Sequence, residues 1–396
     1  MEFRDFQAKE REPIIKNVRR VVVKIGSKIL SGKNLKLSRS RVKLLVGDIN
    51  ALISAGLDVV VVSSGAVLSG LEKLAIKGRP ADLSAKQAAA AVGQGYLMQM
   101  YQNAFDAHKR RVAQVLLTRD DFRFCSRYTN AKRTIETLSK LGVVTIINEN
   151  DAIATDEIKF GENDILSALV AGMVEADLLI LLTDVDGFHA ADPRRDRCAK
   201  LIPVVQLGYD RYIHLAGGPA TSVGSGGMQS KVEAARTAAA TGISSIVANG
   251  LTKNILQKIM SCQDTGTIFV TGLQKVSGRK HWLVFASYPQ GTIVVDSRAQ
   301  QVLMEGGDLM PEGVCSTSGS FRARDVVNLA CVDGSVFARG VTNYSAQEIR
   351  WRKERGDLIS NAQENKGYDE VVYRDKVVLL GQHHPSKSKT AELVNA

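Results

Sequence analysis

Strand-length apolar runs alternate with amphipathic segments through the first two-thirds of the chain, and this alternation limits the fold more than any other feature. The runs occupy residues 19–26, 58–62, 112–117, 143–147, 178–182 and 245–248. Apolar residues at helical spacing predict a helix at 38–55, and further helices are expected at 83–105, which is rich in Ala, at the polar stretch 128–140 and at 230–240. Because the runs are apolar throughout rather than at every second position, they are typical of strands covered on both faces. We therefore expect an α/β fold, an αβα sandwich around a mainly parallel sheet.

The pattern changes after about Gly272. Short β-like runs follow at 292–295, 326–330 and 336–341, separated by Gly, Asp and Pro turns. A chain of 396 residues is also longer than one compact unit usually is. We expect a first domain at 17–271, a linker at 272–290, a small β-rich domain at 291–375 and a polar, disordered tail at 382–396.

The net charge and the cysteine content indicate which ligands the chain could bind and in which compartment it could fold. The net charge of +11 suits anionic ligands such as nucleotides, and it suits nucleic acid equally well. The five cysteines are scattered without paired spacing, which favours reduced thiols over a disulfide framework or a zinc site. No apolar run reaches the roughly 18–20 residues that span a bilayer, and the N-terminus lacks the apolar core of a secretory signal. We expect a cytoplasmic protein with no membrane partner.

Ligands of parallel sheets gather beyond the carboxyl ends of the strands, so the residues after each run are candidates for a site. Lys24 precedes a glycine turn and could hold an ammonium group over phosphate oxygens, although a solvated lysine would look the same. Ser64 and Gly65 follow a buried run and open an expected helix. Their hydroxyl and amide groups could bind a carboxylate or simply cap that helix.

Two further candidates lie later in the first domain. The stretches 148–151 and 161–164 concentrate acidic and amide groups, which can bind an α-ammonium ion, orient lysines or attract Mg²⁺, or can form a polar loop. Thr183 and Asp184 end another run, and the glycine loop at 224–231 leads into a helix. That loop is a plausible phosphate cradle or a flexible linker, and it lacks the spacing of a Walker A motif.

Taken together, these stretches resemble the amino acid kinase family, and within it the glutamate kinase branch. The matching stretches, in the expected order, are VVVKIGS (21–27), VVSSGAV (61–67), INENDAIAT (147–155), KFGENDILSALVA (159–171), LLTDVDGFHAADPR (181–194) and GSGGMQSK (224–231). The INEND and FGEND pair is the part most specific to that branch. RKHW (279–282), GTIVVDSRAQQVLMEGGDLMPEGV (291–314) and the remainder to about Asp375 look like a PUA domain. Departures are GSGGM for the commoner GTGGM, His189 where Tyr is common, and a segment before Asn17 without a clear counterpart.

The resemblance implies a reaction. It implies ATP-dependent phosphorylation of the γ-carboxylate of L-glutamate, the first step of proline biosynthesis, with Mg²⁺ carried mainly on the ATP phosphates. Lys24 and Lys231 would contact the transferring phosphoryl group and the leaving oxygens of ADP, and Asp164 would orient both lysines. No general base is required, because the γ-carboxylate is already ionised near neutral pH.

The resemblance also assigns the binding residues. Those for glutamate are Ser64, Asp151 and Asn163, with Asn148 and Gly65 as weaker candidates. Those for ATP are Lys24, Thr183, Asp184, Ser225, Gly226, Gly227, Met228, Gln229, Ser230 and Lys231. No residue is assigned as a metal ligand.

Partners of the protein are also implied, and two other functions remain possible from the sequence. The resemblance implies proline as a feedback inhibitor, a glutamate-5-semialdehyde dehydrogenase that uses the labile acyl phosphate, and a homo-oligomer. A kinase for another small acid, such as aspartate, acetylglutamate or a nucleoside monophosphate, is one alternative. An RNA-binding protein with a vestigial kinase core is the other; the scattered basic residues of the second domain argue against RNA.

Overall fold

The computed structural model divides the chain into two compact units, Met1–Gly278 and Arg279–Ala396, which are described separately. It describes residues 11–32, 36–76, 78, 82–153, 163–191, 193, 196, 198–207, 227–272, 275, 283, 289–354 and 370–380. The tail predicted at 382–396 and most of the linker predicted at 272–290 lie outside these residues. The limits 17–271 and 291–375 remain predictions.

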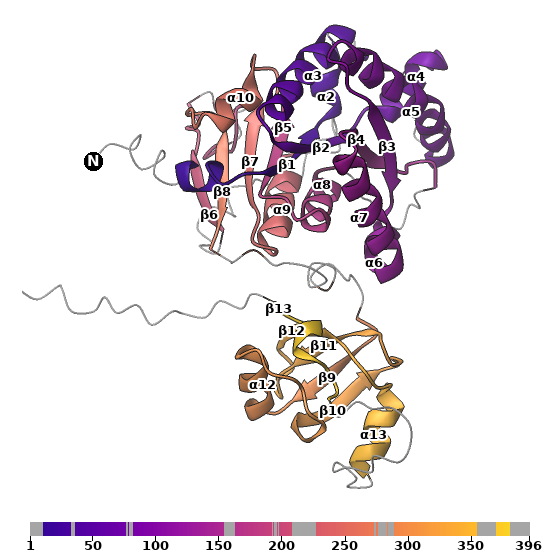
Figure 1. Cartoon of the computed structure of the whole chain (residues 1–396), viewed down its shortest axis with the longest axis vertical. Coiled ribbons are helices and arrows are strands. Elements are labelled where there is room, and N and C mark those ends of the chain that lie inside the picture. The colour runs from indigo at the N-terminus through magenta and orange to yellow at the C-terminus, as the bar shows by residue number, and fades with distance from the viewer. Residues whose placement is uncertain are drawn as a thin grey trace, which may run out of the picture. The chain divides into compact units, whose positions relative to one another are not determined.

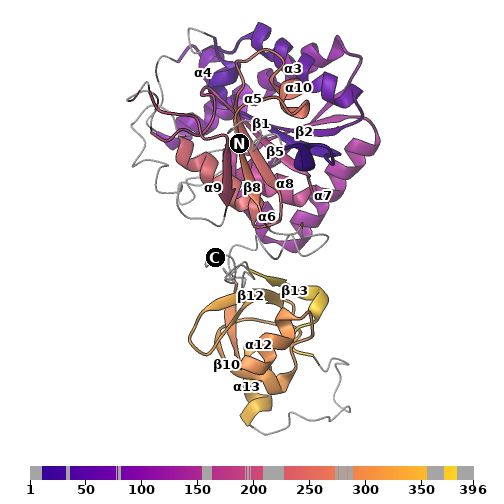
Figure 2. The same ribbon diagram turned by 90° about the vertical axis from the view of Figure 1, so that its left-hand side faces the viewer.

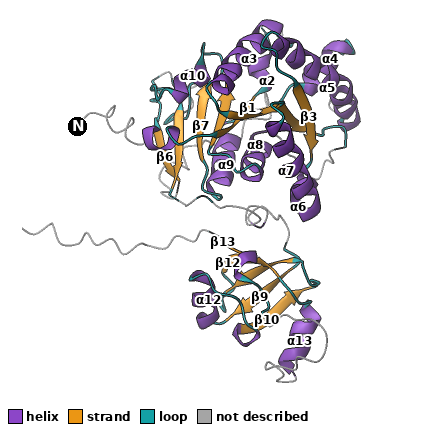
Figure 3. Ribbon diagram, in the orientation of Figure 1, coloured by secondary structure: helices purple, strands orange, loops and turns teal. Residues whose placement is uncertain are grey.

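The first unit is built on a sheet of eight strands within the described residues, in the order β3-β4-β2-β1-β5-β7-β8-β6 (Figure 1 and Figure 3). The strands are β1 (Arg20–Ile25), β2 (Asp58–Ser63), β3 (Val112–Leu117), β4 (Val144–Glu149), β5 (Leu178–Thr183), β6 (Val204–Leu207), β7 (Ser244–Asn249) and β8 (Thr267–Thr271). Neighbouring strands pair in parallel except β7 with β8, so the mainly parallel sheet is confirmed. The apolar pattern does not predict β6 and β8, because short strands near one edge carry too few residues to show a period.

Helices cover both faces of this sheet. They are α2 (Ser27–Leu30), α3 (Arg39–Ser54), α4 (Ala66–Lys73), α5 (Leu83–Asp106), α6 (Arg119–Arg123), α7 (Cys125–Lys140), α8 (Asn163–Met173), α9 (Met228–Ala239) and α10 (Ile255–Met260). Apolar side chains of α3, α5 and α10 share one core with those of the central strands. Helices α7, α8 and α9 lie on the opposite face (Figure 1), and Figure 2 shows the same division after a quarter turn.

Two glycines let α4 and α5 pack backbone against backbone. A Cβ on Gly70 would lie 1.7 Å from the carbonyl oxygen of Ala89, and one on Gly93 would lie 1.9 Å from that of Ala66. No other residue fits at either position without moving a helix. Because α4 begins at Ala66, this contact also locates the preceding Ser64–Gly65 turn.

The described residues just before Asn17 pack against the rest of the first unit. Residues 11–15 form a helical turn, and Arg11 is only 1% exposed. Its guanidinium donates hydrogen bonds to the carbonyl oxygens of Gln263 (3.1 Å), Thr265 (2.8 Å) and Gly266 (2.7 Å). These carbonyls lie between α10 and β8, so the N-terminal turn holds that connection in place.

Arg11→Ala is expected to lower the free energy of unfolding by about 2–3 kcal/mol, because buried carbonyl groups lose their donor. Urea unfolding of the purified variant measures the change. Lys16→Ala is the matched control, because Lys16 pairs with Glu12 beside the same turn but is exposed, and exposed pairs contribute little to stability. Equal effects of the two substitutions would contradict a structural role for Arg11.

The second unit holds a smaller sheet and has its own core. Within the described residues its five strands run in the order β10-β9-β11-β12-β13. They are β9 (Gly291–Val295), β10 (Val314–Gly319), β11 (Val326–Ala330), β12 (Val336–Val341) and β13 (Val377–Leu379), accompanied by α12 (Ser297–Met304) and α13 (Ala346–Glu354). Residues of both helices join the strands in one apolar cluster. The expected β-rich second domain is confirmed, although the sequence pattern does not predict β10, β13 or these helices.

Within the part of the chain that the structure describes, every helix is too short or too polar to cross a bilayer.

Candidate active site

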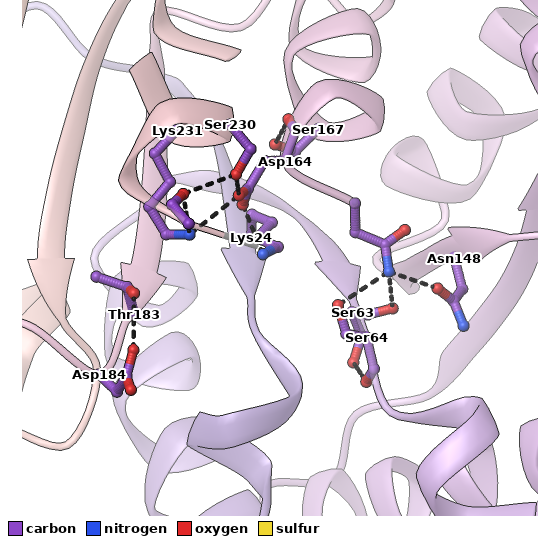
Figure 4. Close-up of polar contacts among 12 residues, drawn as sticks. Lys24, Ser63, Ser64, Asn148, Asp164, Ser167, Thr183, Asp184, Ser230 and Lys231 are labelled. Atoms are coloured by element: carbon purple, nitrogen blue, oxygen red, sulfur yellow. Dashed lines mark hydrogen bonds and ion pairs between the residues drawn. The ribbon is translucent and has the colours of Figure 1, made fainter. Parts of the chain in front are cut away.

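The carboxyl ends of the central strands bring the predicted residues to one edge of the sheet. In register, Ile25 of β1 lies between Ser63 of β2 and Leu182 of β5. Figure 4 shows Lys24, Asp164 and Lys231 between Ser63–Ser64 on one side and Thr183–Asp184 on the other. The order of the strands therefore places a lysine between two polar strand ends.

A buried carboxylate joins two lysines at the centre of this edge. Asp164, in the first turn of α8, has no exposed side-chain surface. Its Oδ1 lies 2.5 Å from Nζ of Lys24, on β1, and its Oδ2 lies 3.1 Å from Nζ of Lys231, in the first turn of α9. The Ser230 hydroxyl donates to the same Oδ2 at 2.8 Å. Helices α8 and α9 and strand β1 each supply one charge, so the cluster exists only in the folded chain.

The electrostatics of this cluster favour an anionic ligand. Burial by itself raises the pKa of Asp164, but the ammonium groups of Lys24 and Lys231 and the Ser230 hydroxyl outweigh it and hold this pKa at about 2. The carboxylate is therefore ionised at neutral pH. Two cations share it, so the three side chains together carry an excess of positive charge. Such an arrangement suits phosphate oxygens.

A second polar cluster lies at the ends of β2 and β4. The Asn163 side-chain amide donates to Oγ of Ser64 (2.9 Å), to Oδ1 of Asn148 (2.9 Å) and to the carbonyl oxygen of Ser63 (3.3 Å). Its Oδ1 is buried and accepts no hydrogen bond from the described residues. Gly65 adopts a left-handed conformation, φ +116°, and caps the start of α4. A buried acceptor of this kind fits a ligand that brings its own N–H or O–H groups.

Two acidic side chains follow this cluster along the chain. Burial raises the pKa of Glu149 to about 8, and the nearby Asp151 adds to the shift. Burial also raises the pKa of Asp151 to about 6. Carboxyl groups kept out of water in this way gain most from a cationic partner. The site residue Asp151 thus lies where an ammonium ion would be stabilised.

The nucleotide candidates are grouped beside the lysines. Thr183 ends β5, and its hydroxyl donates to Oδ1 of Asp184 at 3.3 Å. Gly227 caps the start of α9, and the carbonyl oxygen of Gly227 accepts from the Ser230 hydroxyl at 2.8 Å. Met228, Gln229, Ser230 and Lys231 form the first turn of α9. Ser225 and Gly226 lie outside the described residues.

Several supporting side chains are absent from the predicted set. Gln94 of α5 accepts a hydrogen bond from the Asn148 amide at 2.9 Å and donates to Oε1 of Gln114 at 3.2 Å. Tyr101 and Ser63 hydrogen-bond through their hydroxyls at 2.8 Å. Gln94 lies between Gly93 and Gly95 in α5, and the local sequence does not mark it as a site residue. Its partner on a distant strand could not be predicted from local spacing.

Comparison with known proteins adds an independent line of evidence. The amino acid kinase family model matches residues 19–249, and the PUA domain model matches residues 291–362. Glutamate 5-kinase of Geobacter sp. (strain M21) is 43% identical over 93% of this chain and 100% of its own length. Glutamate 5-kinase of Carboxydothermus hydrogenoformans is 42% identical over 93% of this chain and 99% of its own length. The solved carbamate kinase from Giardia lamblia covers 65% of this chain and 99% of its own, with 20% identity and a TM-score of 0.47.

Proposed function

Because the chain belongs to the amino acid kinase family, in its glutamate 5-kinase branch, we propose that it transfers the γ-phosphoryl group of ATP to the γ-carboxylate of L-glutamate. This reaction is the first step of proline biosynthesis. The arrangement of charged and polar side chains at the edge of the sheet supports this reaction. The cluster of Lys24, Asp164 and Lys231 lies between the polar cluster at the ends of β2 and β4 and the Thr183–Asp184 end of β5.

Phosphoryl transfer needs alignment of donor and acceptor and neutralisation of charge on the transferring group. Lys24 and Lys231 supply that positive charge from two separate elements. Asp164 holds both ammonium groups at fixed positions, so little reorganisation is needed when charge develops. The glutamate γ-carboxylate is ionised near neutral pH and acts as the nucleophile without a general base.

Glutamate recognition is assigned to the cluster at β2 and β4. The Ser64 hydroxyl and the amide of Gly65 would bind a carboxylate of the substrate. The free acceptor of Asn163 and the carboxylate of Asp151 would receive the α-ammonium group. Asn148 acts mainly by orienting Asn163, to which it is hydrogen-bonded.

ATP binding is assigned to Thr183, Asp184 and the stretch 225–231. No group of three His, Cys, Asp or Glu within the described residues is spaced to hold a metal ion by itself. The carboxylates of Asp164 and Asp184 already pair with lysines, so the residues fit a Mg²⁺ ion that arrives on the ATP phosphates. The ion would supply further neutralisation of phosphate charge.

Trapping the acyl phosphate with hydroxylamine tests the reaction. Hydroxamate should form with ATP and L-glutamate and be much slower with aspartate or acetylglutamate in place of glutamate. UMP would give a phosphoanhydride and no hydroxamate, so it is compared with glutamate by release of ADP. A preference for any of those substrates would overturn the assignment. Repeating the assay with added proline tests the proposal that proline is a feedback inhibitor.

Glutamate binding is expected to release protons near neutral pH. An ammonium group beside Asp151 and Glu149 favours their ionised forms and lowers the pKa values from about 6 and about 8. The glutamate KM should therefore fall as the pH rises from about 5.5 to about 7.5. Calorimetry in two buffers of different ionisation enthalpy measures the proton release, and Asp151→Asn is the control that should weaken it. Proton uptake on binding would contradict the assignment.

The proposal extends to the compartment, the functional partner and the oligomeric state of the enzyme. The scattered, unpaired cysteines support a cytoplasmic enzyme. The acyl phosphate product is labile, which supports a glutamate-5-semialdehyde dehydrogenase as functional partner. Homo-oligomer formation is proposed from the resemblance alone, and sedimentation of the purified chain tests it.

A further inference from the structure

The loop that follows β5 is held by one side chain from the segment after β1 and one from the end of β7. Lys28, on α2 directly after β1, lies with Nζ 3.0 Å from Oδ2 of Asp184. Asn249, the last residue of β7, donates from Nδ2 to Oδ1 of Asp186 at 2.9 Å. β1 and β7 flank β5 in the sheet, so the two carboxylates of the loop are bound from opposite sides.

The Asn249 amide is itself oriented. Its Oδ1 accepts a hydrogen bond from the Leu251 backbone N–H at 3.0 Å, which turns the Nδ2 group toward Asp186. The next residue, Gly250, donates its backbone N–H to the carbonyl oxygen of Thr183 at 2.9 Å. The end of β7 therefore holds both the backbone and a carboxylate of the loop.

The far end of the loop is also anchored. The hydroxyl of Thr267, on β8, accepts a hydrogen bond from the Phe188 backbone N–H at 2.8 Å. Gly187 has φ +156°, and a Cβ there would lie 2.7 Å from that same hydroxyl. With both ends held, the conformation between Thr183 and Gly187 depends on how its two aspartates are paired.

The Lys28–Asp184 pair matters for position and charge more than for stability. Both side chains are partly exposed, 50% and 38%, and exposed ion pairs stabilise a fold only slightly. Burial alone would raise the pKa of Asp184, but Lys28 and the Thr183 hydroxyl hold it below its ordinary value. Without Lys28, an uncompensated carboxylate would face any polyphosphate bound at the end of β5, and like charges repel.

We propose that Lys28 and Asn249 are positioning residues for the nucleotide. Lys28 and Asn249 hold the carboxylates of Asp184 and Asp186 at the two sides of the loop, and Lys28 also neutralises Asp184. These contacts fix the position of Thr183, which would then contact the phosphate chain of ATP. This inference rests on the proposed function, because it assumes that ATP binds at the end of β5. Neither residue touches the cluster of Asn163, so glutamate binding is independent of both.

Steady-state kinetics of Lys28→Met test the first half. The ATP KM is expected to rise about 5–20-fold while kcat changes less than about 3-fold, as for a binding loop that is displaced. The glutamate KM should stay within about 2-fold, which also shows that the variant is folded. Lys28→Arg should restore most of the ATP affinity. Lys43→Met, an exposed lysine on α3, is the matched control and should leave both KM values unchanged.

A double-mutant cycle decides whether Lys28 acts through Asp184. Lys28→Met should raise the ATP KM much less in an Asp184→Asn background than in the wild type, because no carboxylate is left to neutralise. An equal increase in both backgrounds would mean that Lys28 binds the nucleotide directly, and no increase in either would remove its role. Activity of the wild-type enzyme in the same assay separates these outcomes from failure of the proposed function.

Substitutions at Asn249 test the second half. Asn249→Asp places a carboxylate against Asp186 and should raise the ATP KM more than Asn249→Ala does. Asn249→Ala alone should raise it about 3–10-fold. If Asn249→Asp binds ATP as well as Asn249→Ala, the charge of the loop is irrelevant and the proposal fails.

Discussion

Lys24→Met is expected to lower kcat by about 10²–10³-fold, the range found when one preorganised donor at a developing anion is removed. Lys24 is almost fully buried, and its Nζ lies 2.5 Å from Asp164. Methionine has a similar length, so the variant removes the charge with little change of volume. Because the lost interaction is strongest in the transition state, kcat should fall much more than KM for either substrate rises.

The Lys24→Met variant must be folded for its loss of activity to be assigned to the missing charge. Asp164 keeps Lys231 and the Ser230 hydroxyl as partners, so Lys24→Met should fold. Adding Asp164→Asn to Lys24→Met leaves the buried Lys231 without its counter-charge, so the double variant should be less stable than Lys24→Met and equally inactive. Near-normal turnover of folded Lys24→Met would refute a catalytic role for this lysine.

Asp164→Asn should have the second large effect, a loss of about 3–5 kcal/mol of folding stability together with most of the activity. Asparagine keeps the shape of the side chain but leaves two buried ammonium groups without their shared counter-charge. Urea unfolding and the hydroxamate assay measure the two losses. Glu233→Gln removes an exposed carboxylate from α9, where it pairs with Arg236, and should cost less than about 1 kcal/mol.

The pH dependence of stability gives an independent check on Asp164. Its pKa is lowered on folding from 3.8 to about 2, so the stabilising contribution is complete above the unfolded value and is lost as the pH falls toward 2. The difference in stability between wild type and Asp164→Asn should therefore be constant above about pH 5 and shrink below pH 4. A difference that grew as the pH fell would contradict the paired carboxylate.

Local patterns predicted the central part of the sheet well. Strands β1, β2, β4 and β5 are mainly apolar runs, and each ends at or beside a residue that the sequence predicts for the site. Parallel pairing brings those ends to one edge of the sheet, so the sequence pattern alone groups Lys24, Ser64 and Thr183. The pattern does not predict β6, β8 and β13, because three to five residues carry little periodic signal, and it does not predict β10, because VCSTSG is mostly polar.

The sequence by itself determined the architecture and the chemical types present, because apolar periodicity and turn residues act over a few neighbouring positions. The tertiary structure alone decided which charges share a partner. Asp164 pairs with Lys24, which lies well over a hundred residues earlier in the chain, and with Lys231, which lies 67 residues later. Arg11 donates to carbonyl oxygens 252 to 255 residues away. The pairing of Lys28 with Asp184 and of Asn249 with Asp186 arises in the same way. Contacts of this kind depend on strand order and helix packing, which bring distant segments within hydrogen-bonding distance and which no local pattern encodes.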